Sequence, residues 1–196
     1  IPEKRLWLHA VSVGEVLQLQ TVIEGIQKQR SDVVFVISTT TSTGMAVAKE
    51  KYPSHLVCYF PLDFSWAVRR AFECIRPDAV VLVELELWPN FILEAERTGT
   101  PLVLINGRIS AKSFRGYSRI RLLMKRLLGC FRTFAVQNET YKDRLVELGA
   151  AEERIEVTGS IKFDRVQTDR HNPQTEELRR SFGLQEHERI FVAGST

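Results

Sequence analysis

Residues 6–38 read LWLHAVSVGEVLQLQTVIEGIQKQRSDVVFVIS, and this stretch decides the fold. Its two ends, Leu6–Val11 and Val33–Ser38, are short apolar runs with few polar residues, as expected for strands that are covered on both faces. Between them, Val16–Gln29 carries apolar residues at near-helical spacing. A strand, a helix and a second strand in this order predict two parallel strands joined by a right-handed crossover.

The same alternation continues along the chain. Further strands are predicted at Leu56–Tyr59, Ala79–Val83, Leu102–Ile105, Thr133–Val136 and Ile155–Val157. Helices are predicted between them at Met45–Lys51, Ser65–Ile75, Pro89–Arg97, Tyr117–Leu128 and Glu139–Leu148, with Gly99 and Gly149 at helix C-caps. Alternation repeated this often predicts an α/β fold, a doubly wound parallel sheet of about seven strands with helices on both faces.

Composition excludes several classes of protein. The 196 residues carry a formal charge of +3, which is too small to predict a nucleic-acid partner. No apolar run approaches the roughly 18–20 residues that span a bilayer. The histidines and cysteines show no metal-ligand spacing, and there is no GxGxxG dinucleotide fingerprint, so the sequence predicts neither a metal nor a bound cofactor.

The chain is predicted to divide into three parts. Residues 1–163 hold the strand–helix alternation and form the predicted N-terminal domain. Residues 164–188 begin with a polar, turn-rich stretch and contain a helix predicted at Gln174–Phe182, so we interpret them as a linker and connecting helix. Residues 189–196 include one apolar strand without a following helix, and we expect them to be the first strand of a truncated C-terminal domain, either detached from the main sheet or paired with a neighbouring molecule.

In folds of this kind the functional residues lie in loops after the carboxyl ends of the strands. The first such loop is Ser12-Val13-Gly14-Glu15. Gly14 permits a tight turn, and Glu15 falls in the first turn of a helix, where backbone N–H groups and the helix dipole favour an ionised carboxylate. Such a carboxylate could act as a general base, with Ser12 supporting it. The alternative is a plain capping carboxylate.

Hydroxyl groups crowd the loop after the second strand, which reads Thr39-Thr40-Thr41-Ser42-Thr43-Gly44. Hydroxyls and free N–H groups at the start of a helix can bind an anion or the hydroxyls of a sugar, so Thr39, Thr40 and Ser42 are candidate site residues. The alternative is a helix N-cap with more hydroxyls than it needs.

Two acids, Glu84 and Glu86, follow the fourth strand. If this segment stays extended, both side chains lie on the same side, where each would raise the pKa of the other. Asn106 and Arg108 follow the fifth strand. The arginine could bind a phosphate or carboxylate through two hydrogen bonds, or it could pair with one of the two acids.

Basic residues mark two more places. Ser160 and Lys162 follow the seventh strand, and a lysine just before the linker would face an interdomain cleft, where it could neutralise a phosphate. The stretch Lys112–Arg132 combines lysines and arginines with leucines, and its basic face could meet anionic lipid headgroups. The alternative for this stretch is an ordinary surface helix whose apolar stripe packs on the sheet.

Together these loops resemble one family. Six blocks occur in the order and spacing typical of the 3-deoxy-D-manno-octulosonic acid (Kdo) transferases of lipopolysaccharide assembly: Ser12–Glu15, Thr39–Gly44, Glu86–Asn90, Asn106–Ser110 with Gly116-Tyr117, Gln137–Glu139 and Gly159–Asp164. The resemblance covers essentially the whole chain. Several blocks in a fixed order are far more specific than any one of them.

The resemblance implies a GT-B architecture, in which two Rossmann-like domains face a cleft and this chain is the N-terminal, acceptor-binding one. It implies an inverting, metal-independent transfer of Kdo from CMP-Kdo to a lipid A precursor, with Glu15 as the general base and Glu86, with Glu84 nearby, shaping the site. Members of this family usually lie at the cytoplasmic face of the bacterial inner membrane. We expect this chain to lack their N-terminal anchor and their donor domain, and therefore to be inactive alone.

Two other classes of function stay open at this point. One is a different GT-B enzyme, such as another lipid-linked sugar transferase or a nucleotide-sugar epimerase. The other is a Rossmann-like binding module without catalysis, against which the acids at the strand ends argue.

Overall fold

The computed structural model describes residues 3–164, 169, 172–185, 188 and 191. The chain divides into two compact units, residues 1–164 and residues 165–196. The first unit contains the sheet and the candidate site. The second contains helix α8 (Pro173–Phe182), which Asn172 caps by accepting a hydrogen bond from the Thr175 N–H at 2.9 Å. The strand predicted within residues 189–196 lies outside the described residues, apart from Phe191.

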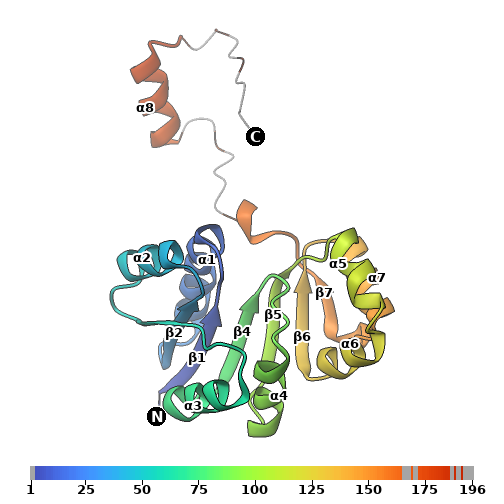
Figure 1. Cartoon of the computed structure of the whole chain (residues 1–196). Helices are drawn as coiled ribbons and strands as arrows, with labels where there is room; N and C mark the ends of the chain where they lie inside the picture. Colours follow the sequence, from blue (N-terminus) through green and yellow to red (C-terminus); the bar gives the residue numbers. More distant parts are fainter. Residues whose placement is uncertain (1–2, 165–168, 170–171, 186–187, 189–190, 192–196) are drawn as a thin grey trace. The chain divides into compact units, whose positions relative to one another are not determined.

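A single parallel sheet organises the first unit (Figure 1). Its strands are β1 Lys4–His9, β2 Val33–Thr39, β3 Leu56–Tyr59, β4 Ala79–Val83, β5 Leu102–Gly107, β6 Phe131–Val136 and β7 Ile155–Val157. In the described part of the chain the strand order is β3-β2-β1-β4-β5-β6-β7, and every neighbouring pair is parallel. The predicted doubly wound α/β fold is confirmed.

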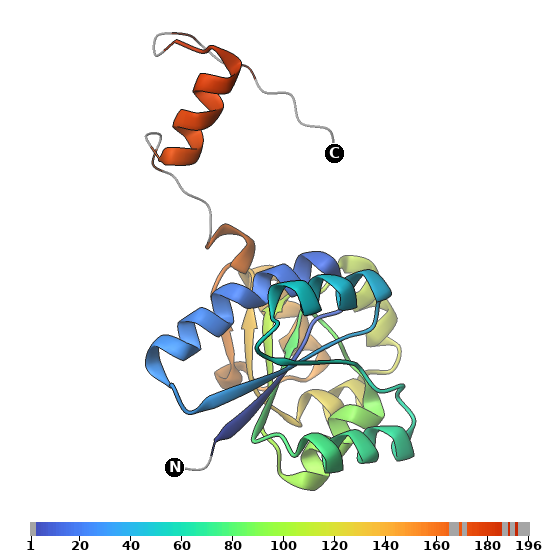
Figure 2. The ribbon, with the colours of Figure 1, turned by 90° about the vertical axis from the view of Figure 1, so that its left-hand side faces the viewer.

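Helices cover both faces of this sheet, as Figure 2 shows from the side. The main helices are α1 Val13–Gln29, α2 Ser42–Lys51, α3 Ser65–Ile75, α4 Pro89–Thr98, α6 Arg121–Leu128 and α7 Glu139–Leu148. Helices α1 and α2 share one apolar cluster with one face, and α3, α4, α6 and α7 share a second cluster with the other. The winding direction therefore reverses between β1 and β4, which is the switch point where such folds bind ligands.

Alternation along β1 produces the two clusters. Trp7 points into the cluster under α3 and α4, while Leu8 points into the cluster under α1 and α2, and both side chains are fully buried. The Trp7 ring lies 5.5 Å from the Phe72 ring and 5.0 Å from the Phe91 ring, measured between centroids. Burial on both sides of a strand is why the sequence reads as an apolar run rather than an alternating one.

One element was predicted wrongly. The helix expected at Tyr117–Leu128 is two helices, α5 Ala111–Ser118 and α6. The first begins ten residues before α6 because Ser110 accepts a hydrogen bond from the Ser113 N–H at 3.0 Å, which caps it. It ends where Ile120 leaves the helical region with φ −118° and ψ 36°. Periodicity alone did not reveal this break, because apolar residues continue on both sides of it.

The other helix ends follow the sequence closely. Gly99 and Gly149 end α4 and α7 in the left-handed conformation, with φ of 68° and 104°. Short 3₁₀ turns, η1 Glu152–Arg154 and η2 Ile161–Phe163, flank β7. No helix among the described residues is long and apolar enough to cross a membrane.

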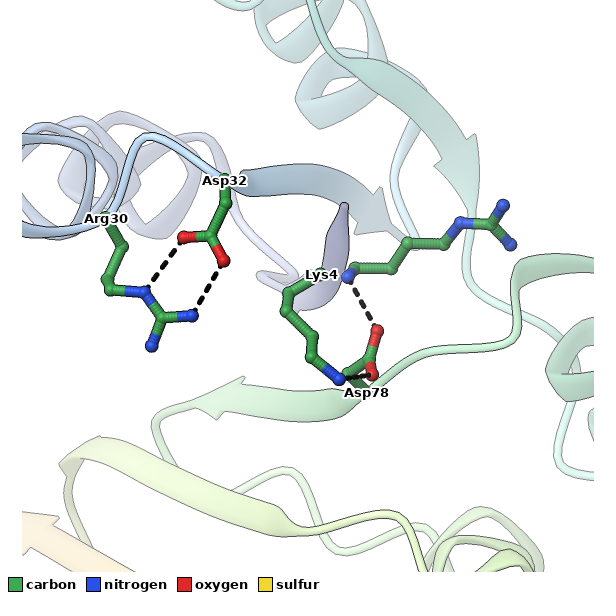
Figure 3. Close-up of polar contacts among 5 residues, drawn as sticks. Lys4, Arg30, Asp32 and Asp78 are labelled. Carbon is green, nitrogen blue, oxygen red and sulfur yellow. Dashed lines mark hydrogen bonds and ion pairs between the residues drawn. The ribbon is translucent and has the colours of Figure 1, made fainter. Parts of the chain in front are cut away.

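At the amino edge of the sheet the charged side chains pair with one another (Figure 3). Lys4 forms an ion pair with Asp78 at 2.8 Å, and the backbone N–H of Arg5 also donates to Asp78, at 2.9 Å. Arg30 binds the carboxylate of Asp32 through two hydrogen bonds of 2.9 and 2.8 Å. These contacts tie the start of β1 to the chain entering β4, and the end of α1 to the chain entering β2.

Candidate functional site

The loops singled out from the sequence meet at the carboxyl edge of the sheet. Ser12 follows β1, Thr40 follows β2, Glu86 follows β4 and Arg108 follows β5, and all of these strands are parallel. The prediction that they share one edge is confirmed. The loops after β1 and β4 flank the switch point between those two strands.

Glu15 lies in the first turn of α1 with 9% of its surface exposed. One carboxylate oxygen accepts a hydrogen bond from the Val11 N–H at 2.8 Å, and the other accepts one from the Ser12 hydroxyl at 2.6 Å. Ser12 in turn accepts from the Glu15 N–H at 3.3 Å, so the two residues cap the helix reciprocally, much as in a capping box. The carboxylate is thus fixed in place, and each oxygen keeps a second lone pair.

The hydroxyl-rich loop divides into structural and exposed members. Thr39 is fully buried, and its hydroxyl donates to the Val11 carbonyl at 3.0 Å. Thr41 is the N-cap of α2 and accepts from the Gly44 N–H at 3.0 Å. A side chain at Gly44 would collide with both threonines, since a Cβ there would lie 2.5 and 2.7 Å from their hydroxyl oxygens. Thr40 and Ser42 are exposed at the same edge.

Glu84 and Glu86 are half-buried beside Glu15. The segment is not extended, because Glu84 has φ 58°, so the assumption behind their predicted common orientation was wrong. Burial raises the pKa of the Glu84 carboxyl, and the Glu15 charge raises it further. Burial also raises the pKa of Glu86, whose Oε2 accepts a hydrogen bond from Trp88 Nε1 at 2.8 Å.

Two basic side chains act on this cluster of acids from a distance. Lys162 and then Arg108 lower the pKa of Glu84, opposing the effects of burial and Glu15. The alternative in which Arg108 pairs with one of the two acids is not observed: among the described residues, no ion pair involves either of these bases or either glutamate after β4. Both basic side chains are exposed.

Two residues at the site were not among the candidate site residues chosen from the sequence, although Tyr117 belongs to one of the blocks that carry the family resemblance. Burial raises the pKa of the Tyr117 phenol in α5, and the nearby charge of Glu86 raises it further. Gln18, one turn after Glu15, accepts a hydrogen bond from the buried Asn106 side chain at 3.0 Å. Gln18 could have been found from its i+3 spacing to Glu15, which places the two on one face of α1. Ser160 is half-buried and precedes η2.

The stretch Lys112–Arg132 forms α5, α6 and the start of β6. Apolar side chains stand exposed on it, Leu122 at 88%, Ile120 at 48% and Leu123 at 45%. Met124, Leu127 and Leu128 of the same helix are buried against the sheet. Helix α6 therefore packs on the sheet and also presents apolar residues outward.

A concave surface lies at the other edge of the sheet, away from Glu15, Glu84 and Glu86. It encloses about 640 Å³ at the amino ends of β5 and β6 and is lined in part by Glu96, Arg132 and Arg154. The guanidinium of Arg154 already donates hydrogen bonds to the carbonyls of Gly129 and Phe131, at 3.1 and 2.9 Å. The acids at the switch point remain the better candidate site. Within the described residues, no group of three or more His, Cys, Asp or Glu side chains could hold a metal ion.

Solved structures define the class of fold. A glycosyltransferase from Rickettsia africae superposes with a TM-score of 0.60 at 13% identity, covering 95% of this chain and 51% of that chain. The UDP-GlcNAc 2-epimerase from Neisseria meningitidis, solved with UDP-GlcNAc bound, gives a TM-score of 0.60 at 12% identity, covering 92% of this chain and 54% of that chain. The chain thus has the Rossmann-like fold of the N-terminal half of a GT-B enzyme.

Sequence comparison identifies the family. Residues 2–165 match the family model for 3-deoxy-D-manno-octulosonic-acid transferase (kdotransferase), and the chain belongs to this family. The 3-deoxy-D-manno-octulosonic acid transferase of Chlamydia pneumoniae is 35% identical over 159 residues, which cover 80% of this chain and 36% of that protein. The Haemophilus influenzae enzyme of the same description is 28% identical over 196 residues, or 100% of this chain and 45% of that protein. The chain therefore spans less than half the length of these relatives.

Proposed function

We propose that this chain is the acceptor-binding part of an inverting glycosyltransferase that moves Kdo from CMP-Kdo to a lipid A precursor without a tightly bound metal. Membership of the Kdo transferase family supports the choice of sugar and acceptor. The observation that carries the proposal is the cluster of Glu15, Glu84 and Glu86 at the switch point. Acidic side chains held close together lower the stability of a fold. At a ligand-binding edge, such an arrangement is expected where one of the acids accepts a proton during catalysis.

In the proposed reaction Glu15 accepts the proton of an acceptor hydroxyl. The hydroxyl oxygen forms a bond to the anomeric carbon of Kdo, and the bond from that carbon to the phosphate oxygen of CMP breaks. Its electron pair leaves with the CMP phosphate, and attack from the opposite side inverts the anomeric centre. The hydrogen bonds from Val11 and Ser12 fix the carboxylate, so that little reorientation is needed at the moment of transfer.

The remaining edge residues suit the other groups of such substrates. Thr40 and Ser42 are exposed and could bind sugar hydroxyls, while Arg108 and Lys162 could face phosphate or carboxylate groups. Asn106 and Thr39 are buried, with 1% and 0% of their surface exposed, so we assign them supporting roles without substrate contact. The donor would be held mainly by the part of the protein outside this chain.

Glu15→Gln in the full-length protein tests the general base. Glutamine keeps the shape of the side chain and one oxygen acceptor but cannot take the proton, so turnover should fall by about 10²–10⁴ while CMP-Kdo binding is kept. Turnover would be measured by product analysis with CMP-Kdo and a tetra-acylated acceptor, and Glu50→Gln, an exposed change on α2, is the matched control. Near-normal turnover of the Glu15 variant would end the assignment and leave Glu84 or Glu86 as the base.

A second proposal concerns the membrane. We propose that the exposed side of α5 and α6 rests on the anionic cytoplasmic surface of the bacterial inner membrane. Leu122, Ile120 and Leu123 would contact the acyl region, and neighbouring arginines would contact headgroups. Arg126 is a poor headgroup ligand, because its guanidinium forms an ion pair with Glu96.

Vesicle sedimentation tests this surface. Arg115→Gln with Arg119→Gln should weaken binding to phosphatidylglycerol vesicles, and salt should weaken the binding of the wild type, because exposed charges are screened over about 8 Å at physiological ionic strength. Lys49→Gln with Lys51→Gln removes the same charge from α2, on the other face of the sheet, and should leave binding unchanged. Equal binding by both double variants would leave an ordinary surface helix.

A further inference from the structure

Asn106, the residue before the last of β5, has an unusual backbone conformation. Its φ is 54°, in the left-handed region, which few residues other than glycine adopt and which asparagine tolerates best. Glu84, the first residue after the neighbouring strand β4, lies in the same region, and its backbone N–H donates to the Ile105 carbonyl at 2.9 Å. Two non-glycine residues in this conformation on adjacent strand ends indicate that the surrounding structure holds them there.

The Asn106 side chain joins segments that are far apart in sequence. Its Nδ2 donates to the Gln18 Oε1 of α1 at 3.0 Å, across 88 positions. Gln137, after β6, donates from Nε2 to the Oδ1 and to the backbone carbonyl of Asn106, both at 3.1 Å. The Ile161 N–H at the start of η2 adds a longer contact to Oδ1 at 3.4 Å. One amide therefore bridges α1, on one face of the sheet, and the loops beyond β5.

The segments that Asn106 joins also contain or adjoin the charged residues that act on Glu84. Gln18 lies one turn after Glu15, and Ile161 immediately precedes Lys162. The charges acting on the Glu84 carboxyl come from Glu15 on α1, Lys162 on η2 and Arg108 after β5, and Glu84 acts in turn on Glu86 in its own loop. Asn106 is 1% exposed, so a substrate cannot contact it. Its influence on the site must pass through the segments that it holds.

We propose that Asn106 is a positioning residue, whose bridge to Gln18 sets the separation between the Glu15 and Glu84 carboxylates. The capping contacts fix Glu15 on α1, but they do not fix α1 relative to β4. Apolar packing holds α1 over β4, since Val16 shares a buried cluster with Val81 and Val83. The bridge adds a directional polar constraint, because it connects the turn after Glu15 to the strand beside Glu84. The catalytic consequence rests on the proposed function, whereas the geometry can be tested without it.

The structural test measures the coupling between the two acids in this chain. Carboxyl-carbon NMR titration gives the pKa of Glu84 with and without Glu15→Gln, and in the wild type the substitution should lower that pKa, because Glu15 raises it. Asn106→Gly suits the left-handed backbone but removes the side-chain amide. In this variant, adding Glu15→Gln should lower the pKa of Glu84 by less than it does in the wild type. Each pKa difference is taken between two proteins that both contain Lys162 and Arg108, so the effects of these two bases on Glu84 cancel.

Two further variants keep the test decisive. Gln18→Ala breaks the bridge and leaves the backbone of β5 untouched, so it should reduce the coupling as Asn106→Gly does, and the pair should not be additive. Gln27→Ala is exposed on α1 and should leave the coupling unchanged. Undiminished coupling in a folded Asn106→Gly protein and in Gln18→Ala would overturn the proposal. If Asn106→Gly does not fold, Gln18→Ala alone decides.

The catalytic consequence is tested in the full-length protein. Asn106→Gly should lower kcat by about 10-fold or more with the KM for CMP-Kdo unchanged, since small displacements of catalytic groups cost up to about 10²-fold in rate. Reduced coupling together with normal kcat would overturn the catalytic role of the bridge. A wild-type protein without transferase activity would instead refute the proposed function, and the titration result would stand independently of it.

Discussion

The two edges of the sheet treat their charged groups in opposite ways. At the amino edge, Lys4 pairs with Asp78 and Arg30 pairs with Asp32, and the hydrogen bond from each basic partner lowers the pKa of the carboxyl (Figure 3). At the carboxyl edge, burial and neighbouring acids raise the pKa values of Glu84 and Glu86.

The difference shows at which edge unfavourable charge interactions lower the stability of this fold. Ion pairs at the amino edge join chain segments, and their side chains are exposed or partly exposed, so each pair is expected to contribute little to stability. At the carboxyl edge, no ion pair among the described residues relieves Glu84 or Glu86, although exposed Arg108 and Lys162 lie near enough to influence Glu84. Unrelieved acids at a switch point are the expected signature of a functional edge.

The largest effect on stability is expected at Glu15, where capping and charge can be separated. Glu15→Ala loses both capping hydrogen bonds and should lower the free energy of unfolding of this chain by about 1–2 kcal/mol. Glu15→Gln keeps one acceptor and removes the repulsion of Glu84, so it should stay within about 0.5 kcal/mol of the wild type. Chemical denaturation measures both, with Glu50→Ala as the control. Equal losses in the two variants would show that the charge itself stabilises the fold.

A smaller effect of opposite sign is expected at Glu84. A carboxyl with a raised folded-state pKa binds more protons in the folded state, so the free energy of unfolding falls as pH rises from the unfolded to the folded pKa. Glu84→Gln should therefore stabilise the chain at about pH 7, by less than about 1 kcal/mol because the half-exposed carboxyl is screened. The gain should vanish below about pH 4, where the unfolded carboxyl is also protonated.

Thermal melts of wild type and Glu84→Gln across this pH range would check the sign. Glu156→Gln, an exposed change on β7, is the matched control. A variant that is less stable than the wild type at neutral pH would mean that Glu84 has a stabilising partner, and the contrast between the edges would fail.

The smallest effect is expected at the amino edge. Asp78 has a lowered pKa, so its contribution to stability is present above the ordinary aspartate pKa and is lost as pH falls through the folded value. Asp78→Asn should destabilise the chain slightly at neutral pH and low salt, and high salt should erase the difference because the pair is exposed. Denaturation at two salt concentrations tests this. A loss that persists in high salt would show that the hydrogen bond from Arg5, rather than the charge, matters.

Much of the fold could be predicted because parallel strands covered on both faces leave a local signal. The apolar runs of β3, β4 and β7 were predicted with their observed bounds, and Gly99 and Gly149 marked two helix ends. The break between α5 and α6 could not be predicted from periodicity, because apolar residues continue on both sides of Ile120, where the backbone leaves the helical region. The loops that contain the site residues could also be predicted, because they follow the carboxyl ends of the predicted strands.

The chemistry of the site was less accessible to sequence. Glu15 was correctly placed in the first turn of a helix, but its reciprocal capping with Ser12 was left as one of two alternatives. Thr39 and Asn106 were grouped with substrate-binding residues, yet both are buried. A polar residue after a strand has the same sequence signature whether it faces solvent or the interior, so burial could not be inferred.

The sequence by itself determined the order of strands and helices, the family and the set of loops that could carry chemistry, because these depend on local periodicity and on motifs. Only the tertiary structure decided which polar groups meet. The contact between Asn106 and Gln18 spans 88 positions, and the proximity of Glu15 to Glu84 exists only because winding reverses between β1 and β4. Hydrogen bonds and charge interactions act over distances in space, and the chain fixes those distances only when the sheet has formed.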